Sequence, residues 1–295
     1  MRGSPHSDQD EAARKLPSGL LVAFAGLLVL TPTTAAAAEP AVPGRQLHVT
    51  TYNIHHGVGT DGVLDLERIA QVIEKSAADV VGLQEVDKHW SARSNWVDQP
   101  AWLARRLHLH VAYAANLDLP PVNPGEPRRQ YGTAVLSRYP IKDFGNTLLP
   151  LYLGGEQRGL AVASIKVRGW DLRFANTHLT PDNNAERLDQ ARKVVEFLGG
   201  SNQPTVLVGD LNARPETPEL KTLTAVWRDT WTEVGVGPGY TVEADNLTAR
   251  IDYLLHTPGW RPRDRLGPTL RPVSAEVLTT NASDHLPVTA TFTLR

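Results

Sequence analysis

Short apolar runs, separated by segments with helical spacing, constrain the fold of this chain more than any other feature. Residues 80–83, for example, form a continuous apolar run typical of a buried strand. After Asp65, a residue suited to an N-cap, apolar residues recur with helical spacing through Ile73. Strands and helices that alternate in this way predict an α/β fold. No linker or internal repeat divides the chain after residue 46, so we expect one domain over residues 47–295.

The N-terminal segment has a pattern of its own. Basic residues precede an apolar run at residues 20–30, and small residues follow it up to Ala38. The run is too short to span a bilayer, which takes about 20 residues, and the pattern is typical of a secretory signal peptide. We therefore expect residues 1–38 to be a signal peptide and residues 39–46 a linker. The mature chain is expected to be a secreted, extracellular monomer without stable membrane insertion.

The composition excludes several classes of protein. The chain has no Cys, which excludes disulfide scaffolds, Cys-ligated zinc or iron, and thiol nucleophiles. Its apolar fraction of 41% is too high for a disordered chain. Lys and Arg number 30 against 32 Asp and Glu, so no overall positive field favours indiscriminate binding of nucleic acid.

Polar residues stand repeatedly where a predicted apolar strand ends. In an α/β core, strand ends are where rigid sites are built. Asp252 interrupts an apolar strand, and a carboxylate in that setting must be paired, ligated or facing a site. Asp210 and Asn212 alternate, which places them on the same face of a strand. The polar positions of this kind are Asn53, Glu85, His178, Asp210, Asn212, Asp252, Asp284 and His285.

Between these positions, the region 115–130 is rich in Pro, Asn and Gly, and it predicts a long loop. The segments 160–167 and 171–177 are two strands joined by a three-residue turn, so they predict a hairpin.

Seven segments form an ordered set of motifs. They are residues 51–54 (TYNI), 83–86 (LQEV), 131–141 (YGTAVLSRYPI), 176–179 (NTHL), 209–212 (GDLN) with Pro215, 250–253 (RIDY) and 283–287 (SDHLP). This set resembles the endonuclease/exonuclease/phosphatase superfamily, also called the DNase I-like hydrolases. The resemblance covers residues 47–295 and implies an α/β four-layer sandwich, in which two facing β-sheets are flanked by helices.

The resemblance implies a divalent cation as cofactor. Glu85 would be its main carboxylate ligand, with Asn53 and Asp284 close by. Oxygen ligands in a chain without Cys favour Mg²⁺, Mn²⁺ or Ca²⁺ over zinc. Mg²⁺ is the ion we expect.

The resemblance also implies metal-dependent hydrolysis of a phosphodiester by direct water attack, without a covalent intermediate. Asp210 would orient and deprotonate the attacking water, and Asn212 would donate to the phosphoryl group. His178 and His285 would contact phosphate oxygens. Asp252 would hydrogen-bond to His285, fixing its ring and favouring its charged form.

Three positions are expected to bind phosphate, namely Asn53, Tyr131 and Arg158. Arg158 precedes a strand and matches a position that often binds phosphate in the superfamily, although exposed arginines are common. Tyr131 is either a core tyrosine or a hydroxyl beside the phosphate.

The substrate is left open among three alternatives. An extracellular nuclease would hold backbone phosphates with the arginines of residues 128–129 and 261–265, although the net charge of −2 weighs against this. A phospholipid phosphodiesterase, acting on sphingomyelin or an inositol lipid, would use the tryptophans of residues 90–102 at a membrane surface, unless these pack in the core. A non-catalytic binding module is the third, and it conflicts with the complete set of core positions.

Overall fold

Two six-stranded sheets form the body of the protein. The computed structural model describes residues 46–201, 203–242, 244, 246–258 and 269–294, so the predicted signal peptide and residues 39–45 of the predicted linker lie outside the described residues. The first sheet has the order β11 (Leu270–Val277), β12 (Val288–Leu294), β1 (Gln46–Asn53), β2 (Val80–Lys88), β4 (Arg129–Ser137) and β3 (His110–Leu119). The second has the order β5 (Ile141–Leu148), β6 (Gly159–Val167), β7 (Trp170–His178), β8 (Thr205–Asp210), β10 (Asp252–His256) and β9 (Arg228–Asp229).

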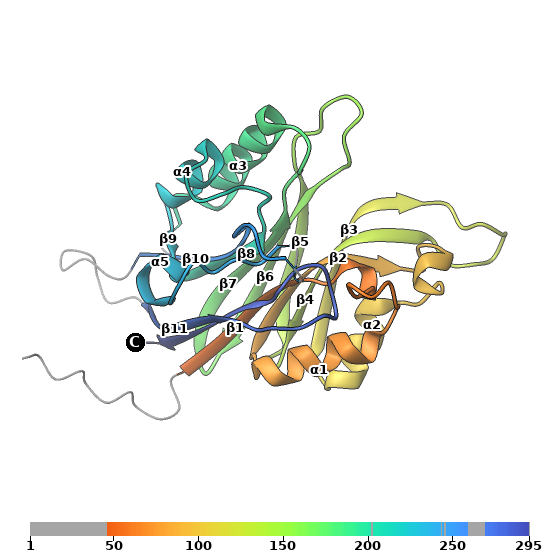
Figure 1. Cartoon of the computed structure of the whole chain (residues 1–295), viewed down its shortest axis with the longest axis horizontal. Coiled ribbons are helices and arrows are strands. Elements are labelled where there is room, and N and C mark those ends of the chain that lie inside the picture. Colours follow the sequence, from red (N-terminus) through yellow and green to blue (C-terminus); the bar gives the residue numbers. More distant parts are fainter. Residues whose placement is uncertain (1–45, 202, 243, 245, 259–268, 295) are drawn as a thin grey trace, which may run out of the picture. The chain divides into compact units, whose positions relative to one another are not determined.

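Helices cover the outer faces of both sheets. Helices α1 (Leu66–Ser76) and α2 (Gln99–Leu107) pack on the first sheet, and α3 (Asn184–Leu198) and α4 (Pro218–Thr224) pack on the second (Figure 1). A short helix, α5 (Thr230–Val234), contacts β10 and β11. The core between the sheets is built from inward-facing apolar residues of both, so the predicted four-layer sandwich is confirmed. Among the described residues, no helix is both long and apolar enough to cross a bilayer.

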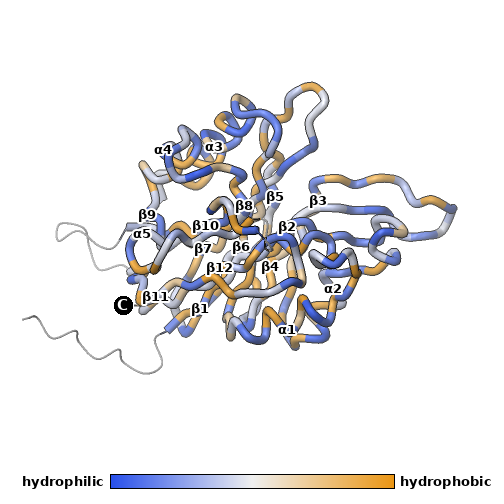
Figure 2. The backbone as a smooth tube through the Cα atoms, in the orientation of Figure 1, coloured by the Kyte–Doolittle hydropathy of each residue, from blue (hydrophilic) through white to orange (hydrophobic). Residues whose placement is uncertain are grey.

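Helix α1 shows how the sequence pattern forms an outer layer. The Asp65 carboxylate caps it by accepting from the backbone N–H groups of Glu67 (2.9 Å) and Arg68 (3.1 Å). Ile69 and Ile73 are buried against the first sheet, as the periodicity predicts. Figure 2 shows hydrophobic and hydrophilic positions alternating along this helix, as expected for one that is covered on one side.

The predicted long loop at residues 115–130 is confirmed for residues 120–128 and wrong at both ends. Strand β3 continues to Leu119 and pairs with β4, which begins at Arg129, so only the segment between them is irregular. The register of this ladder shifts between Ala115 and Leu117, as at a β-bulge. By contrast, the predicted hairpin is confirmed, because β6 and β7 pair in antiparallel fashion.

A buried polar contact ties the two sheets together behind the strand ends. Asn176 of β7 donates from Nδ2 to the carbonyls of Leu83 and Ala134 (both 2.9 Å), and its Oδ1 accepts from Gln84 Nε2 of β2 (2.7 Å). The sheets come so close here that a Cβ on Gly82 would lie 2.4 Å from a Val208 methyl group. This contact fixes the spacing of the sheets just below their polar ends.

Strand register brings the polar ends together. His178 ends β7 and Asp210 ends the parallel strand β8, and the two are register partners. Asp252 opens β10, which is antiparallel to β8, and it is also a register partner of Asp210. In the other sheet, Asn53 ends β1 opposite Gln84 of β2. One edge of the sandwich thus collects the polar residues that the sequence places at strand ends.

Candidate active site

Asn53 joins the two sheets at this edge. Its fully buried side chain donates from Nδ2 to Glu85 Oε1 (3.0 Å) in its own sheet and to Asp210 Oδ2 (3.1 Å) in the other. Its Oδ1 accepts from the backbone N–H of His55 (3.1 Å). The amide therefore holds the predicted metal carboxylate and the predicted base at a fixed separation.

Glu85 owes its position to an irregularity in β2. The pairing of β2 with β4 shifts register between Leu83 and Val86, and Glu85 has a φ of 57°. A non-glycine residue in this left-handed region is uncommon, and such strain occurs often at functional sites. The bulge gives Glu85 a half-buried place among otherwise buried neighbours of the strand.

Asp210, Asp252 and His285 form a buried cluster, which we call the Asp–Asp–His cluster. His285 Nδ1 bonds to Asp252 Oδ2 at 2.9 Å, and His285 Nε2 lies 3.7 Å from Asp210 Oδ2. Burial works against the charged imidazole, but Asp252 and Asp210 outweigh it and raise the pKa of His285 to about 10. Burial, together with the charge of Asp252, raises the pKa of Asp210 to about 7. The cluster therefore pairs a protonated imidazole with a carboxylate that titrates near neutrality.

His178 is the second buried histidine of the site, and it is neutral. Burial and the nearby Arg158 guanidinium hold its pKa well below the usual value. Arg158 Nη1 lies 2.8 Å from His178 Nδ1, and because a guanidinium can only donate, the ring proton must be on Nε2. This N–H lies 3.4 Å from Asp210 Oδ2, which can accept from it. Asn212 Nδ2 lies 3.1 Å away, but it is itself a donor and bonds to the Leu179 carbonyl (2.9 Å). His178 thus presents an N–H donor to the centre of the site.

The structure gives Arg158 two partners that the sequence did not predict. Besides His178, its guanidinium contacts Glu156 Oε1 at 3.1 Å, and the side chain is almost fully buried. Burial raises the pKa of Glu156. Arg158 is therefore not an exposed surface cation, which was one of the two alternatives. Its 2.8 Å contact with His178 Nδ1 orients that imidazole ring.

Tyr131 and Asp284 flank the site. Tyr131 is largely buried. Its ring centroid lies 5.8 Å from that of Trp90 and 5.3 Å from the Cζ atom of the Arg93 guanidinium. Burial and Glu85 raise the pKa of its hydroxyl well above the usual value. Asp284 is half-exposed and lies 3.8 Å from His55 Nδ1.

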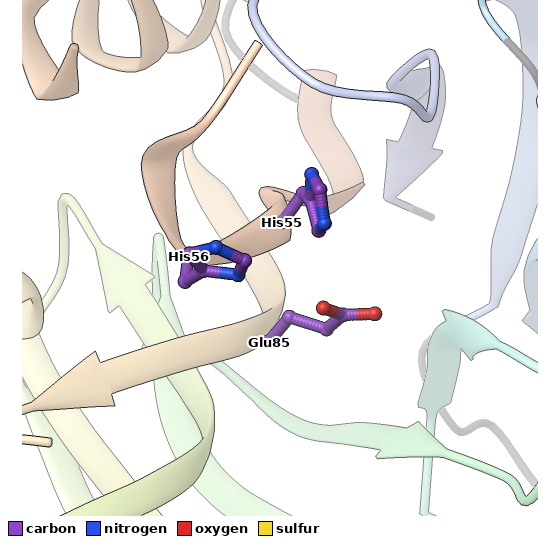
Figure 3. A group of neighbouring side chains, drawn as sticks. All are labelled: His55, His56 and Glu85. Carbon is purple, nitrogen blue, oxygen red and sulfur yellow. The ribbon is translucent and has the colours of Figure 1, made fainter. Parts of the chain in front are cut away.

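Two groups of side chains among the described residues could hold a metal ion. One is the Asp–Asp–His cluster, and the other consists of His55, His56 and Glu85, which we call the His–His–Glu cluster. In each, one ligand atom per residue lies within 4.8 Å of the others. Figure 3 shows the Glu85 carboxylate extending beneath the two imidazole rings. In the buried cluster, His285 Nδ1 and Asp252 Oδ2 already bond to each other, and Asp210 Oδ2 accepts from Asn53, so the half-buried cluster is the better cation site.

His55 and His56 were missed as site residues by the reasoning from sequence. The available signal was their position directly after Ile54, two and three residues from Asn53. Burial, with Arg93 and His55 adding to it, lowers the pKa of His56 to about 4, so the ring is neutral at pH 7.

The arginines and tryptophans that were expected to contact substrate do not form one group in the structure. Arg128 bonds to Asp118 (2.7 Å), and Arg129 donates to the Pro120 carbonyl (2.9 Å), so both arginines already have partners. Residues 261–265 lie outside the described residues. Trp102, a residue of α2, is partly buried against the core of the first sheet, whereas Trp96 is 42% exposed.

Comparisons with known proteins show the family of this chain. A family model described as "Endonuclease/Exonuclease/phosphatase family" matches residues 50–285. YbhP of Escherichia coli K12, an uncharacterised protein, is 29% identical over 175 residues, which are 56% of this chain and 66% of YbhP. The match thus spans slightly less than two thirds of that curated relative.

Solved structures extend the likeness to the whole fold. The endonuclease/exonuclease/phosphatase from Beutenbergia cavernae DSM 12333 is 30% identical with a TM-score of 0.67, over 85% of this chain and 72% of that one. The mannosyl-6-phosphatase Bt3783 of Bacteroides thetaiotaomicron VPI-5482 is 19% identical with a TM-score of 0.64, over 84% of this chain and 99% of that one. At that identity, the second likeness concerns the fold alone.

Proposed function

This chain belongs to the endonuclease/exonuclease/phosphatase family, and we propose that it hydrolyses phosphodiester bonds by direct water attack with the help of a divalent cation. The observation that carries the proposal is the Asp–Asp–His cluster. A carboxylate whose pKa is near 7 and an imidazolium lie within 4 Å of each other at the end of a rigid strand. General base catalysis is most effective when the pKa of the base lies near the working pH.

Each residue of the site has a part in this reaction. Asp210 would accept the proton of the attacking water through its carboxylate. His285 would keep its proton and stabilise the negative charge that develops on the phosphoryl oxygens. His178, held in the Nε2–H tautomer, would donate to one of these oxygens, with Asn212 beside it. Asp252 would hold the His285 ring in place.

The residues around Glu85 fit a divalent cation. Glu85 is half-buried at the bulge of β2, and His56 Nδ1 is buried without a hydrogen-bond partner among the described residues, so donor atoms are available here. Glu85 would be the main ligand, with Asn53 and Asp284 close by, and these oxygen ligands favour Mg²⁺. When bound, the cation would supply Lewis-acid stabilisation of the phosphoryl oxygens.

Nucleic acid is the first substrate class we propose, as for an extracellular nuclease. Secretion, predicted from residues 1–38, fits an enzyme that degrades extracellular polymers. Two observations weigh against this class: the charge of the chain is near neutral, and Arg128 and Arg129 already bond to other groups of the protein.

A phospholipid head group is the second candidate, because of the segment between β5 and β6. Leu151 is 48% exposed and Leu153 is fully exposed, and this segment leads directly to Glu156 and Arg158. Apolar side chains that are exposed beside a site can contact a lipid surface.

A substrate panel tests the proposal. The purified protein is incubated with Mg²⁺, Mn²⁺ or Ca²⁺ and plasmid DNA, RNA, sphingomyelin vesicles, phosphatidylinositol vesicles or bis-p-nitrophenyl phosphate. Turnover of nucleic acid that falls steeply with salt supports the nuclease. Turnover on vesicles alone supports the lipid enzyme, and Leu153→Ser should then weaken it. Absence of cation-dependent hydrolysis on every substrate would overturn the proposal in favour of a binding module.

A further inference from the structure

The segment after β1 has an unusual backbone that the reaction described above does not explain. His55 and His56 have φ values of 42° and 44°, so two consecutive non-glycine residues lie in the left-handed region. This backbone is strained for residues with a side chain, and the strain persists only where the surroundings enforce it. The strain is consistent with a functional requirement for these two side chains at these positions.

The surroundings do hold this segment firmly. The His56 carbonyl accepts from Gln99 Nε2 at 2.6 Å, and the Gly57 carbonyl accepts from Asp65 N–H at 2.8 Å. Gly57 has a φ of 87°, and a Cβ there would lie 2.8 Å from a Leu66 methyl group. The two imidazoles are therefore presented from a preorganised turn.

We propose that His55 and His56 bind a divalent transition-metal cation together with Glu85, so that the ion at Glu85 is Mn²⁺, Co²⁺ or Zn²⁺ in preference to Mg²⁺. The proposal rests on the proposed function only in placing a cation at Glu85. Mg²⁺ takes oxygen ligands almost exclusively, whereas imidazole nitrogen suits the transition metals. Two imidazoles beside one carboxylate therefore reverse the preference that the oxygen ligands alone predict.

The separations suit a shared ion. Metal–nitrogen and metal–oxygen bonds are about 2.0–2.2 Å, so two ligand atoms on one ion lie at most about 4.4 Å apart. The ligand atoms of the His–His–Glu cluster lie within 4.8 Å of one another, so small side-chain rotations bring them into range. Figure 3 shows all three side chains turned toward the same space.

The ring nitrogens are also in a state to bind. His55 Nδ1 lies 3.3 Å from the Val58 carbonyl, which can only accept, so the proton is on Nδ1 and the Nε2 lone pair is available. Histidine ligands of metals commonly donate their other ring N–H to a carbonyl in this way. His56 Nδ1 is buried and has no hydrogen-bond partner among the described residues. A metal ion would satisfy that nitrogen.

Pulsed electron paramagnetic resonance of bound Mn²⁺ tests the assignment directly. The full chain is stripped of metal and loaded with one equivalent of Mn²⁺, and the spectrum is examined for coupling to ¹⁴N. His55→Asn and His56→Asn are combined, because Asn tolerates the left-handed backbone that both positions need. His108→Asn is the matched control, since His108 also has a positive φ (55°) and caps α2 on the outside of the first sheet.

The wild type and the His108→Asn variant should show nitrogen coupling, and the double variant should lose it. The dissociation constant for Mn²⁺ should rise roughly 10- to 100-fold in the double variant, while that for Mg²⁺ changes much less. Absence of nitrogen coupling in the wild type, or its persistence in the double variant, would overturn the proposal.

The two proposals can fail separately. Nitrogen coupling without hydrolysis of any substrate would leave the metal site standing and remove the enzymatic function. Hydrolysis with Mg²⁺, without nitrogen coupling to Mn²⁺, would do the reverse. If the double variant does not fold, as judged by circular dichroism, the wild-type spectrum still decides between nitrogen and oxygen ligands.

Discussion

The two ends of β10 each carry a buried histidine contact, and the two rings titrate in opposite directions. At the first residue of the strand, Asp252 bonds to His285, whose pKa rises to about 10. At the last residue, His256 bonds to Thr230 Oγ1 (2.9 Å) and lies against the Phe292 ring, and burial lowers its pKa to about 4. The five-residue strand β10 thus contacts a charged imidazole, His285, at its first residue and ends in a neutral one, His256.

The difference shows what makes one end a reactive site. Both histidines are removed from water, which by itself favours the neutral ring. Only the end where the strand register adds carboxylates reverses that preference, and it does so with Asp210 and Asp252 side by side. His256 stays neutral although Glu233 Oε2 lies 3.7 Å from its Nε2 and Asp229 raises its pKa, because burial outweighs both. At His285, the buried carboxylates outweigh burial and give a charged group suited to phosphate.

Replacing Asp252 with Asn should have the largest effect, because it makes the first end of β10 resemble the last. The His285 pKa should fall, and the Asp210 pKa should fall too, since the Asp252 charge raises both. We expect kcat/KM to drop roughly 10²- to 10⁴-fold. Rates measured across pH check this, with both limbs of the profile displaced to lower pH. An unchanged rate would remove Asp252 from the reaction.

The pH profile of the wild type is the next test. Activity needs Asp210 ionised and His285 protonated, so kcat/KM should rise up to about pH 7 and fall again above about pH 10. Outside this window, it should change by about tenfold per pH unit. Activity that increases steadily toward low pH would contradict the assignment of Asp210 as the base.

The other end of β10 should affect stability instead. The folded-state pKa of His256 lies below its unfolded value of about 6.5, so its stabilising contribution is present above that pH and is lost as the pH falls toward 4. The loss amounts to about 3 kcal/mol. His256→Gln should therefore destabilise less at pH 4 than at pH 7, as measured by urea unfolding at both. An equal cost at both pH values would mean that His256 is not held neutral.

A change far from either end of β10 should have the smallest effect. Asp65→Ala removes the cap of α1 and should lower the free energy of unfolding by about 1 kcal/mol, without altering the pH profile. Urea unfolding and the rate assay check this. A shifted pH profile in this variant would show that the limbs report general stability instead of the site.

Much of the fold and of the site follows from the sequence, for identifiable reasons. Apolar strands with polar ends predict where Asp210, Asp252 and His178 meet, because β-pairing brings strand ends into register. The side-chain partners do not follow in the same way. The contact of Arg158 with His178 depends on the path of the segment before β6, which no local pattern encodes.

The His–His–Glu cluster shows the same limit. His55 and His56 need a left-handed backbone to face Glu85, and Glu85 needs a bulge in β2. Neither the left-handed backbone nor the bulge can be predicted from the sequence, because no periodicity and no glycine marks these positions. The composition of residues 115–130 does not indicate that β3 extends to Leu119, because the extension depends on pairing with β4, which lies further along the chain.

One titration tests the central claim, which is cation-dependent phosphodiester hydrolysis at this site. Chelator-treated wild type and Glu85→Gln are assayed on bis-p-nitrophenyl phosphate while Mn²⁺ is added. We predict no turnover before the addition, saturable recovery in the wild type, and recovery in Glu85→Gln only at far higher Mn²⁺ concentrations. Full turnover by the stripped protein, or equal recovery of both proteins at the same Mn²⁺ concentration, would contradict it.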